Sequence, residues 1–390
     1  MFVKRTGYFH FILLTVLVIA FFACQEEGDN GDLSFVPTQL VIIDDKLMAV
    51  GTSYSPTSIR YPTIAEVGQS PIVYPTETSA RGILLQIEDD DNAYLSYYQA
   101  RSLSHQEEQS HVFLLEKSRL NEKASYGHRT RIIDFEHLAN DTLLSLNYER
   151  GTSSTTLKWF LKKLEIRNIE IKIGVETTVP KQLLHLVNND LLVTGIADGF
   201  EFKDGHSYEE QFAKGFILLT DRMGNEKKQW VKSSDDGHVF FNQAITTDGF
   251  IYVVGEIQQS ETGMDLYISK LNSDLKVIKE YILVKPQHQE VLDMSVKGST
   301  IQLLLKDKNE SDQTHVTLLS LDEQLESIKS RGSETFDKTV VIDALEEEGN
   351  YYLLLHQKEN RQTIPNSIII KINENGKIIE EVKMMVNKVL

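Results

Sequence analysis

The sequence has one cysteine, Cys24, among 390 residues. A single cysteine cannot form an intramolecular disulfide, so the fold must be held by its core alone, even in an oxidising compartment. Basic residues are also in deficit, because 40 Lys and Arg stand against 57 Asp and Glu, which gives a net charge of −17. A chain of this charge repels phosphate backbones, which excludes nucleic acid as a partner.

Catalytic signatures are absent as well. The chain contains no Gly-x-Ser-x-Gly elbow, no His-Glu-x-x-His pair and no phosphate-binding glycine loop. Acidic runs occur at Asp44–Asp45, Asp89–Asp91 and Asp235–Asp236, where hairpin turns or linkers are expected. Asp is favoured in turns for its backbone hydrogen bonds, so these runs predict neither a metal site nor a cofactor.

The N-terminus carries an export signal. Lys4 and Arg5 precede an apolar stretch over 11–23, and a small residue, Ala23, comes just before Cys24. This segment resembles a bacterial lipoprotein signal, with Phe21-Phe22-Ala23-Cys24 as the local match. The resemblance implies cleavage before Cys24 and acylation of its sulfur, which leaves no thiol for catalysis. The alternative is an uncleaved membrane helix over 7–23, which is at the short limit for spanning a bilayer.

The predicted domains are a signal peptide over 1–23, a flexible tether over 24–32 and one folded domain over 33–390. Removing the signal leaves 38 basic against 57 acidic residues, or −19. Residues 25–32 are acidic and short, as in a tether. They resemble the export signals that send lipoproteins to the outer surface in some Gram-negative phyla, and the alternative is an ordinary linker. The expected location is therefore the outer membrane, on the cell surface, with the periplasmic face as the alternative.

A repeated unit decides the architecture. Short apolar segments, each preceded by a turn of Asp, Asn, Glu or Gly, recur with steps of 47, 49, 48, 60, 50 and 50 residues. Most units add a strand before this segment and two after it, so each contains four short antiparallel strands. The first residues of the repeated segments are Leu47, Tyr94, Leu143, Leu191, Ile251, Ile301 and Tyr351.

Four strands per unit of this length predict an all-β fold, a β-propeller of seven four-stranded blades. The alternative is six blades plus an extra hairpin over 82–98, because the first unit must take its third and fourth strands from the proline-containing stretch 59–75. The repeat resembles the degenerate propeller repeats of bacterial secreted proteins, and its clearest copy lies at 248–271. This resemblance covers most of the mature chain and implies no particular activity.

Two connections are longer than a blade requires, and we expect both to link second and third strands. The first covers Thr52–Ala80 and includes Tyr61, and the second covers Ile196–Lys214 and includes Phe202 and Tyr208. Aromatic side chains on long loops are suited to ligand binding. The alternative is that they pack each loop onto its own blade.

Candidate ligand-binding residues also come from the strand starts. Counting 13 residues back from each repeated segment reaches the expected start of the first strand, and no acidic residue stands at any of these positions. If the first strands are innermost, these side chains form a polar and cationic ring around the axis, which suits a carboxylate, a sulfate or an acidic sugar. The ring positions are Ser34, Arg81, Thr130, Thr178, His238, His288 and Lys338.

Two classes of function fit these features. The first is a lipid-anchored binding or scaffolding propeller whose partners are the membrane, through the anchor at Cys24, and outer-membrane proteins or an anionic glycan. The second is a glycan-acting hydrolase or lyase on the same scaffold, because propeller active sites are scattered along the chain and escape motif searches. Converging carboxylates near the axis would favour the enzyme.

Overall fold

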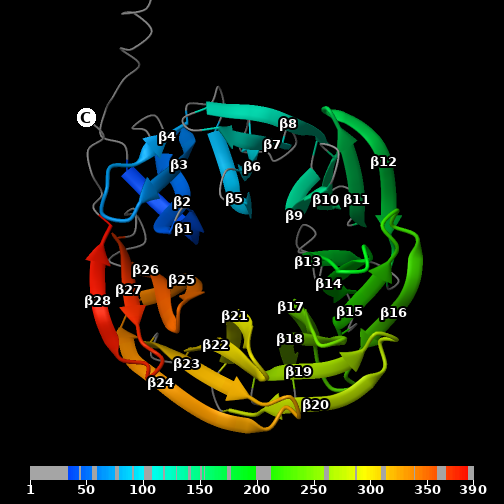
Figure 1. The fold of residues 1–390 in the computed structure, drawn as a ribbon, viewed down its shortest axis with the longest axis vertical. Coiled ribbons are helices and arrows are strands. Elements are labelled where there is room, and N and C mark those ends of the chain that lie inside the picture. The colour runs from blue at the N-terminus through cyan, green and yellow to red at the C-terminus, as the bar shows by residue number, and fades with distance from the viewer. Residues whose placement is uncertain are drawn as a thin grey trace, which may run out of the picture.

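The computed structural model describes residues 34–384, apart from 44, 55–58, 75–78, 90–91, 101–107, 117–118, 129, 139–141, 150–151, 153, 174–176, 199–211, 259–262, 286–287, 309–312, 338 and 358–365. All of its regular elements are strands, and they form seven four-stranded antiparallel sheets arranged as a ring (Figure 1). The chain is therefore a seven-bladed β-propeller, as the repeat predicts.

The first four blades have these strands: β1 (Ser34–Ile43), β2 (Lys46–Tyr54), β3 (Arg60–Glu66) and β4 (Ile72–Val73); β5 (Ser79–Asp89), β6 (Asn92–Ala100), β7 (Glu108–Glu116) and β8 (Arg119–His128); β9 (Thr130–Leu138), β10 (Thr142–Glu149), β11 (Ser154–Leu161) and β12 (Leu164–Ile171); β13 (Thr178–His185), β14 (Leu191–Ala197), β15 (Lys214–Thr220) and β16 (Glu226–Lys232).

The last three blades have these strands: β17 (Val239–Thr247), β18 (Phe250–Gln258), β19 (Met264–Asn272) and β20 (Val277–Leu283); β21 (His288–Lys297), β22 (Thr300–Lys308), β23 (Gln313–Leu321) and β24 (Ser327–Asp337); β25 (Thr339–Glu347), β26 (Asn350–Gln357), β27 (Asn366–Ile372) and β28 (Ile378–Lys383).

Each blade takes its four strands from one continuous stretch of chain, with the first strand innermost (Figure 1). The six-blade alternative is wrong, because β3 and β4 complete the first blade while β5–β8 form a separate one. The expected long loop over Thr52–Ala80 is wrong for the same reason. Tyr61 lies within β3, opposite Ser53 of β2, and not on a loop.

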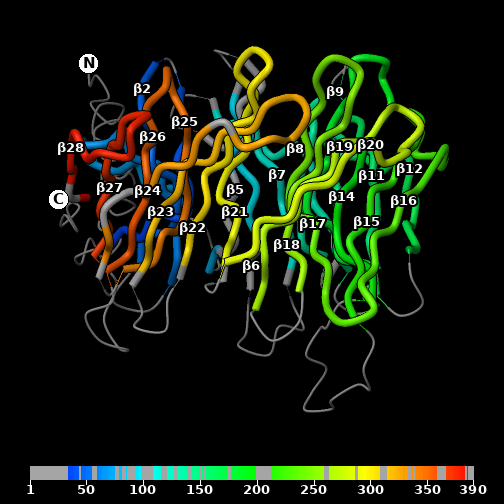
Figure 2. Tube along the Cα trace, turned by 90° about the horizontal axis from the view of Figure 1, so that it is seen from below, coloured from blue at the N-terminus to red at the C-terminus, as the bar shows by residue number. Residues whose placement is uncertain are grey.

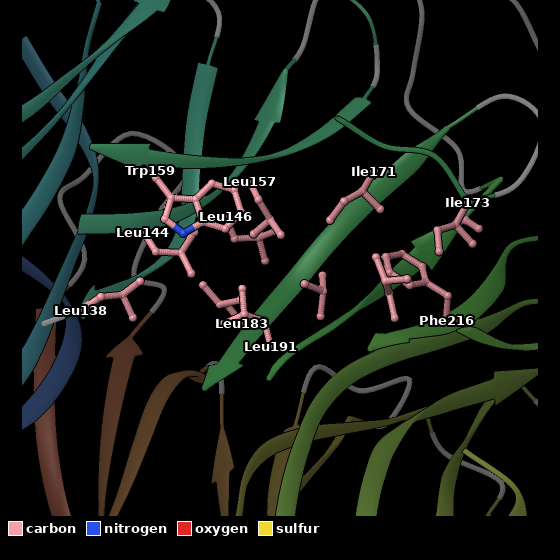
Figure 3. Packing of buried hydrophobic residues seen from close by; sticks show 13 residues of the cluster. Leu138, Leu144, Leu146, Leu157, Trp159, Ile171, Ile173, Leu183, Leu191 and Phe216 are labelled. Atoms are coloured by element: carbon pink, nitrogen blue, oxygen red, sulfur yellow. The ribbon is translucent and has the colours of Figure 1, made fainter. Parts of the chain in front are cut away.

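The hydrophobic core is divided among the interfaces between blades. The described apolar side chains form seven clusters, and each joins two neighbouring blades, including the last and the first. Figure 3 shows the cluster between blades 3 and 4, where Leu144 lies near Leu183 and Phe216 lies beside Ile173. Burying both faces of every sheet in this way lets small sheets stabilise one another around the ring.

A polar ring close to the axis adds a second link between blades. All seven innermost strands have a register shift of the kind a β-bulge produces, and in β1, β9, β13 and β25 an Asp or Gln directly after it accepts a hydrogen bond from a backbone N–H of the following blade. Asp134 Oδ2 accepts from Leu183 at 2.8 Å, and Gln182 Oε1 accepts from Ala244 at 2.7 Å. Gln39 accepts the N–H of Leu85 at 2.8 Å and donates to its carbonyl at 2.9 Å.

The ring closes by packing and hydrogen bonding between blades 7 and 1. Neither sheet borrows a strand from the other among the described residues. Asp343 Oδ2 accepts from the N–H of Leu40 at 2.6 Å, and His356 Nε2 lies 2.8 Å from the carbonyl oxygen of Pro37. These two bonds and the apolar cluster that contains Phe35 hold the closure.

Candidate functional site

The antiparallel order of the strands gives the ring two different faces. The hairpins from first to second and from third to fourth strands lie on one face. The second-to-third connections and the links between blades lie on the other, which we call the connection face. The strands run between these two faces (Figure 2). The first strand of each blade therefore starts at the connection face, where the second strand ends.

A cavity of about 470 Å³ opens at the innermost strands of blades 4, 5 and 6, toward the connection face. We call it the axial cavity. Its lining combines charged, amide and apolar side chains from the starts of first strands and the ends of second strands. The lining residues are Lys181, Ile196, Phe240, Asn242, Glu256, Glu290 and Val291.

Two β-bulges shape this cavity. The pairing of β13 with β14 skips Lys181, and the pairing of β17 with β18 skips Asn242, so each is the extra residue of its bulge. Gly255 allows β17 to approach β18 closely, because a Cβ there would lie 1.8 Å from the carbonyl oxygen of Phe240. The adjacent Glu256 is thereby held against the bulged strand.

The electrostatics of the cavity centre on Glu256, which is 8% exposed. Burial is the main cause that raises the pKa of its carboxyl to about 7, and the negative charge of Glu290 adds to the effect. A hydrogen bond of 3.0 Å from Asn242 Nδ2 and the positive charges of Lys181 and Lys306 oppose it. The Glu290 carboxylate forms its own ion pair with Lys306 at 2.5 Å. Two neighbouring carboxyls thus have different environments, one buried and one ion-paired.

Aromatic rings flank one side of the cavity. His238 stacks on Phe240, with ring centroids 5.7 Å apart, and the edge of Phe212 meets His238 at 5.4 Å. The N–H of Ala213 donates to His238 Nδ1 at 3.0 Å, which fixes the ring, and burial lowers the pKa of this imidazole. Phe212 belongs to the predicted long connection Ile196–Lys214 and is 38% exposed.

The predicted site residues are distributed unevenly. His238 lies beside the axial cavity, whereas Tyr61 is on β3 of the first blade, half-buried. Arg81 and His288 lie on the innermost strands β5 and β21, at the connection face, and their side chains are outside the described part of the structure. Phe202, Tyr208, Lys338 and Cys24 lie outside the described residues altogether.

Two positions of the predicted ring do not line the axis. Thr130 and Thr178 do start their strands, but both are buried. Thr130 donates to Glu149 Oε2 at 2.7 Å, and Thr178 donates to the carbonyl of Ile173 at 2.7 Å. Their hydroxyls therefore satisfy neighbouring groups of the protein and are not presented to a ligand.

Sequence reasoning missed the carboxyl, amide and lysine groups of the axial cavity. One signal was available: Glu256 interrupts the apolar strand Phe250–Gln258, and a charged residue in such a strand is a candidate functional group. The bulge residues Lys181 and Asn242 gave no signal, because a bulge is not readable from hydrophobic period alone. Among the described residues, no group of three or more His, Cys, Asp or Glu is placed to hold a metal ion.

Comparisons with known proteins support the fold. The chain is similar to the β-propeller domain of the Trilobed protease from Pyrococcus furiosus, reported with an open velcro topology, at 13% identity and a TM-score of 0.54, over 90% of this chain and 95% of that one. It is also similar to puromycin hydrolase (8% identity, TM-score 0.54) and to a prolyl endopeptidase (9% identity, TM-score 0.55), over 90% and 91% of this chain respectively.

This chain covers 55% of the puromycin hydrolase chain and 49% of the prolyl endopeptidase chain, about half of each. At these identities the likeness shows the propeller fold alone. No protein-family model matches the chain, and no curated protein matches it.

Proposed function

We propose that this chain is a lipid-anchored, surface-facing binding protein that uses the connection face of a seven-bladed propeller. The observation that carries the proposal is the axial cavity, where three blades bring one lysine, two carboxyls and an amide around an apolar wall. Concave sites with a few convergent polar groups and a perturbed carboxyl are typical of ligand binding.

The anchor is the second part of this proposal. The order of charges and apolar residues before Cys24 supports cleavage and acylation there, and the acidic residues that follow support a tether to the outer surface. Among the described residues, no helix is long and apolar enough to cross a membrane.

Two measurements test the anchor. Metabolic labelling with an alkyne fatty acid should label the wild-type chain and fail with Cys24→Ala. Protease added to intact cells should degrade the wild-type chain if it faces outward. An unlabelled wild-type chain in the membrane fraction would exclude lipid anchoring.

The binding role is tested by cross-linking on intact cells, followed by identification of the captured molecules. Lys181→Glu reverses a charge at the edge of the axial cavity, and Lys181 is exposed, so the variant should fold. We expect it to lose the captured ligand. The matched control is Lys279→Glu on the outer strand β20, which is also exposed and should capture normally. Equal capture by both variants would exclude the axial cavity as the binding site.

A glycan-acting hydrolase or lyase is the second candidate. Glu256 and Glu290 converge on one cavity near the axis; Glu256, with a pKa raised to about 7, is suited to act as a general acid, and Glu290 is the second carboxyl that glycoside cleavage requires. Incubation with a polysaccharide panel and measurement of new reducing or unsaturated ends would test it. Turnover abolished by Glu256→Gln would establish the enzyme, and absence of turnover across the panel would leave the binding function.

A further inference from the structure

We propose that the axial cavity binds the carboxylate of an acidic sugar between Lys181 and Glu256, and that Glu256 takes up a proton on binding. This inference rests on the proposed function and adds the chemical class of the ligand. It follows from how the charges of the cavity are paired, from the burial of Glu256 and from the apolar wall.

The charges of the cavity are unequally satisfied. The side chain of Lys306 is 13% exposed and forms an ion pair with Glu290 at 2.5 Å, so the charges of these two residues largely cancel each other. Lys181 is exposed and forms no ion pair within the described part of the chain. The charged groups outside this ion pair, and so left to meet a charged group of the ligand, are therefore the ammonium of Lys181 and the carboxyl of Glu256.

The protonation state of Glu256 decides which ligand charge is favoured. Four groups face it from the packed strands: Lys181 from β13, Asn242 from β17, Glu290 from β21 and Lys306 from β22. Its pKa is about 7, so the protonated form is well populated at neutral pH. Asn242 donates to Oε1, which leaves Oε2 to carry the proton.

A bound carboxylate would stabilise the protonated form further. The negative charge of the ligand disfavours ionisation of Glu256, and a neutral carboxyl can donate its O–H to the ligand oxygen. Lys181 then supplies the opposite charge. Ligand binding and proton uptake are coupled, because each stabilises the other.

The apolar wall and the size of the cavity favour a sugar. Ile196, Phe240 and Val291 offer a surface for the C–H groups of a pyranose ring, while the Asn242 amide and the Glu290 carboxylate can bond to its hydroxyls. A volume of about 470 Å³ is within the range of small-ligand sites.

Three sugars that share one ring skeleton but differ in charge test which ligand charge the axial cavity prefers. Isothermal titration calorimetry of the full chain in detergent would compare glucuronate, glucose and glucosamine at pH 6, 7 and 8, in two buffers of different ionisation enthalpy. We expect glucuronate to bind best and to take up a proton. Its affinity should fall about tenfold from pH 6 to pH 8, because the protonated fraction of a group with a pKa near 7 falls about tenfold over that interval.

Single-residue variants test whether Lys181 and Glu256 are responsible for glucuronate binding and for its pH dependence. Lys181→Ala should weaken glucuronate binding at least tenfold, and Lys279→Ala on β20 should not change it. Glu256→Gln keeps a neutral hydrogen-bond donor, so it should still bind glucuronate but with no proton uptake and no pH dependence. This readout separates a role in binding from a loss of folding.

Several results would overturn the proposal: preferential binding of glucosamine with proton release, glucuronate affinity that is independent of pH or of Lys181, or no binding of any probe. If these occur while Lys181→Glu still abolishes capture on intact cells, the ligand class is wrong and the binding function stands. If capture is also unaffected, both fail.

Discussion

One position on the second strand distinguishes blade 5 from its neighbours, because blade 5 has a buried glutamate there. Glu256 stands on β18 at the position taken by Ile196 on β14 and by Lys306 on β22, by the spacing of the repeat. The isoleucine presents an apolar side chain to the axial cavity, whereas a carboxylate at this position must be desolvated when the blade folds. The chain thus keeps a residue that costs stability, at the site where a ligand is proposed to bind.

That cost predicts how stability depends on pH. The pKa of Glu256 rises from 4.5 to about 7 on folding, so the folded state favours its protonated form. The contribution of this group to the free energy of unfolding is fully present below about pH 4.5 and is lost as pH rises to about 7. At about 1.4 kcal/mol per pKa unit, the loss is on the order of 3 kcal/mol.

Glu256→Gln removes this titration. Urea unfolding of both proteins between pH 5 and pH 8 should show the variant gaining stability relative to wild type as pH rises. Glu381→Gln, at an exposed position on β28, is the control and should follow wild type. A constant difference between wild type and Glu256→Gln across this range would contradict the raised pKa.

At the scale of single residues, the sequence predicted little of the axial cavity. Its strand-start positions were correct to within two residues, yet Thr130 and Thr178 turned inward to bond to their own neighbours. Lys181, Asn242, Glu256 and Glu290 come from four strands of three blades. Their convergence depends on bulges and on the packing between blades, which no local pattern encodes.

The turn between third and fourth strands is a repeated element in blades 4 to 7. An Asp or Asn opens it and accepts backbone N–H groups two and four residues later, as when Asn272 Oδ1 accepts from Asp274 at 2.9 Å and from Lys276 at 3.0 Å. The residue three positions after this Asp or Asn has positive φ in all four turns: Gly224, Leu275, Leu325 and Gly376.

The packing of the preceding blade determines whether a glycine or a leucine occupies this positive-φ position of the turn. Leu275 is buried in the cluster shared by blades 4 and 5, and this burial offsets the strain of a leucine at φ 58°. At Gly224, side chains of blade 3 fill the corresponding space. A Cβ on residue 224 would lie 2.7 Å from Trp159 and 2.9 Å from Ile169. The turn and its neighbour blade are therefore complementary in shape.

Exchanging leucine and glycine at these two positions should destabilise the protein in either direction. Leu275→Gly relieves about 1 kcal/mol of strain but removes a buried leucine, for a net loss of about 1–3 kcal/mol. Gly224→Leu adds strain and a clash, and should cost more. Denaturant unfolding of each variant measures this. Gly249→Ala, at a turn with positive φ and open space, is the control for strain alone. A stabilised Leu275→Gly would contradict the packing argument.

The strands were more predictable from the sequence than the residues of the axial cavity. Every repeated segment picked out by its spacing begins within the first three residues of a second strand, from Leu47 in β2 to Tyr351 in β26. The period of the repeat encodes this, because each blade must rebuild the same four strands. The first blade was hardest, since β4 has only two residues and prolines interrupt its apolar pattern.

At the scale of the whole molecule, net charge opposes compaction. The net charge of −17, with 57 acidic against 40 basic residues, repels itself in the folded ring, and a single cysteine allows no disulfide within the chain. Salt screens this repulsion, so raising NaCl from 20 mM to 500 mM should increase the melting temperature by a few degrees. Differential scanning calorimetry would measure it. A decrease would mean that exposed ion pairs such as Lys46–Glu66 outweigh the net repulsion.

Closure is the other property of the whole ring. Blades 1 to 7 are joined in order by the chain, but the chain does not continue from blade 7 to blade 1. The interface between them relies on its apolar cluster and on the bonds from Asp343 to Leu40 and from His356 to Pro37. Elsewhere, the same kind of bond from Gln182 to Ala244 joins blades that are also linked covalently.

Removing each bond should therefore have different consequences. Asp343→Ala and Gln182→Ala both leave a backbone N–H without its acceptor, at a cost of about 1–3 kcal/mol each. In Asp343→Ala no chain link limits the separation, so the amides of β1 and β25 should exchange hydrogen faster through local opening of the ring. In Gln182→Ala the amides of β13 and β17 should stay protected up to global unfolding. Hydrogen exchange by mass spectrometry distinguishes the two cases, and equal local opening at both interfaces would show that closure is no weaker than any other contact between blades.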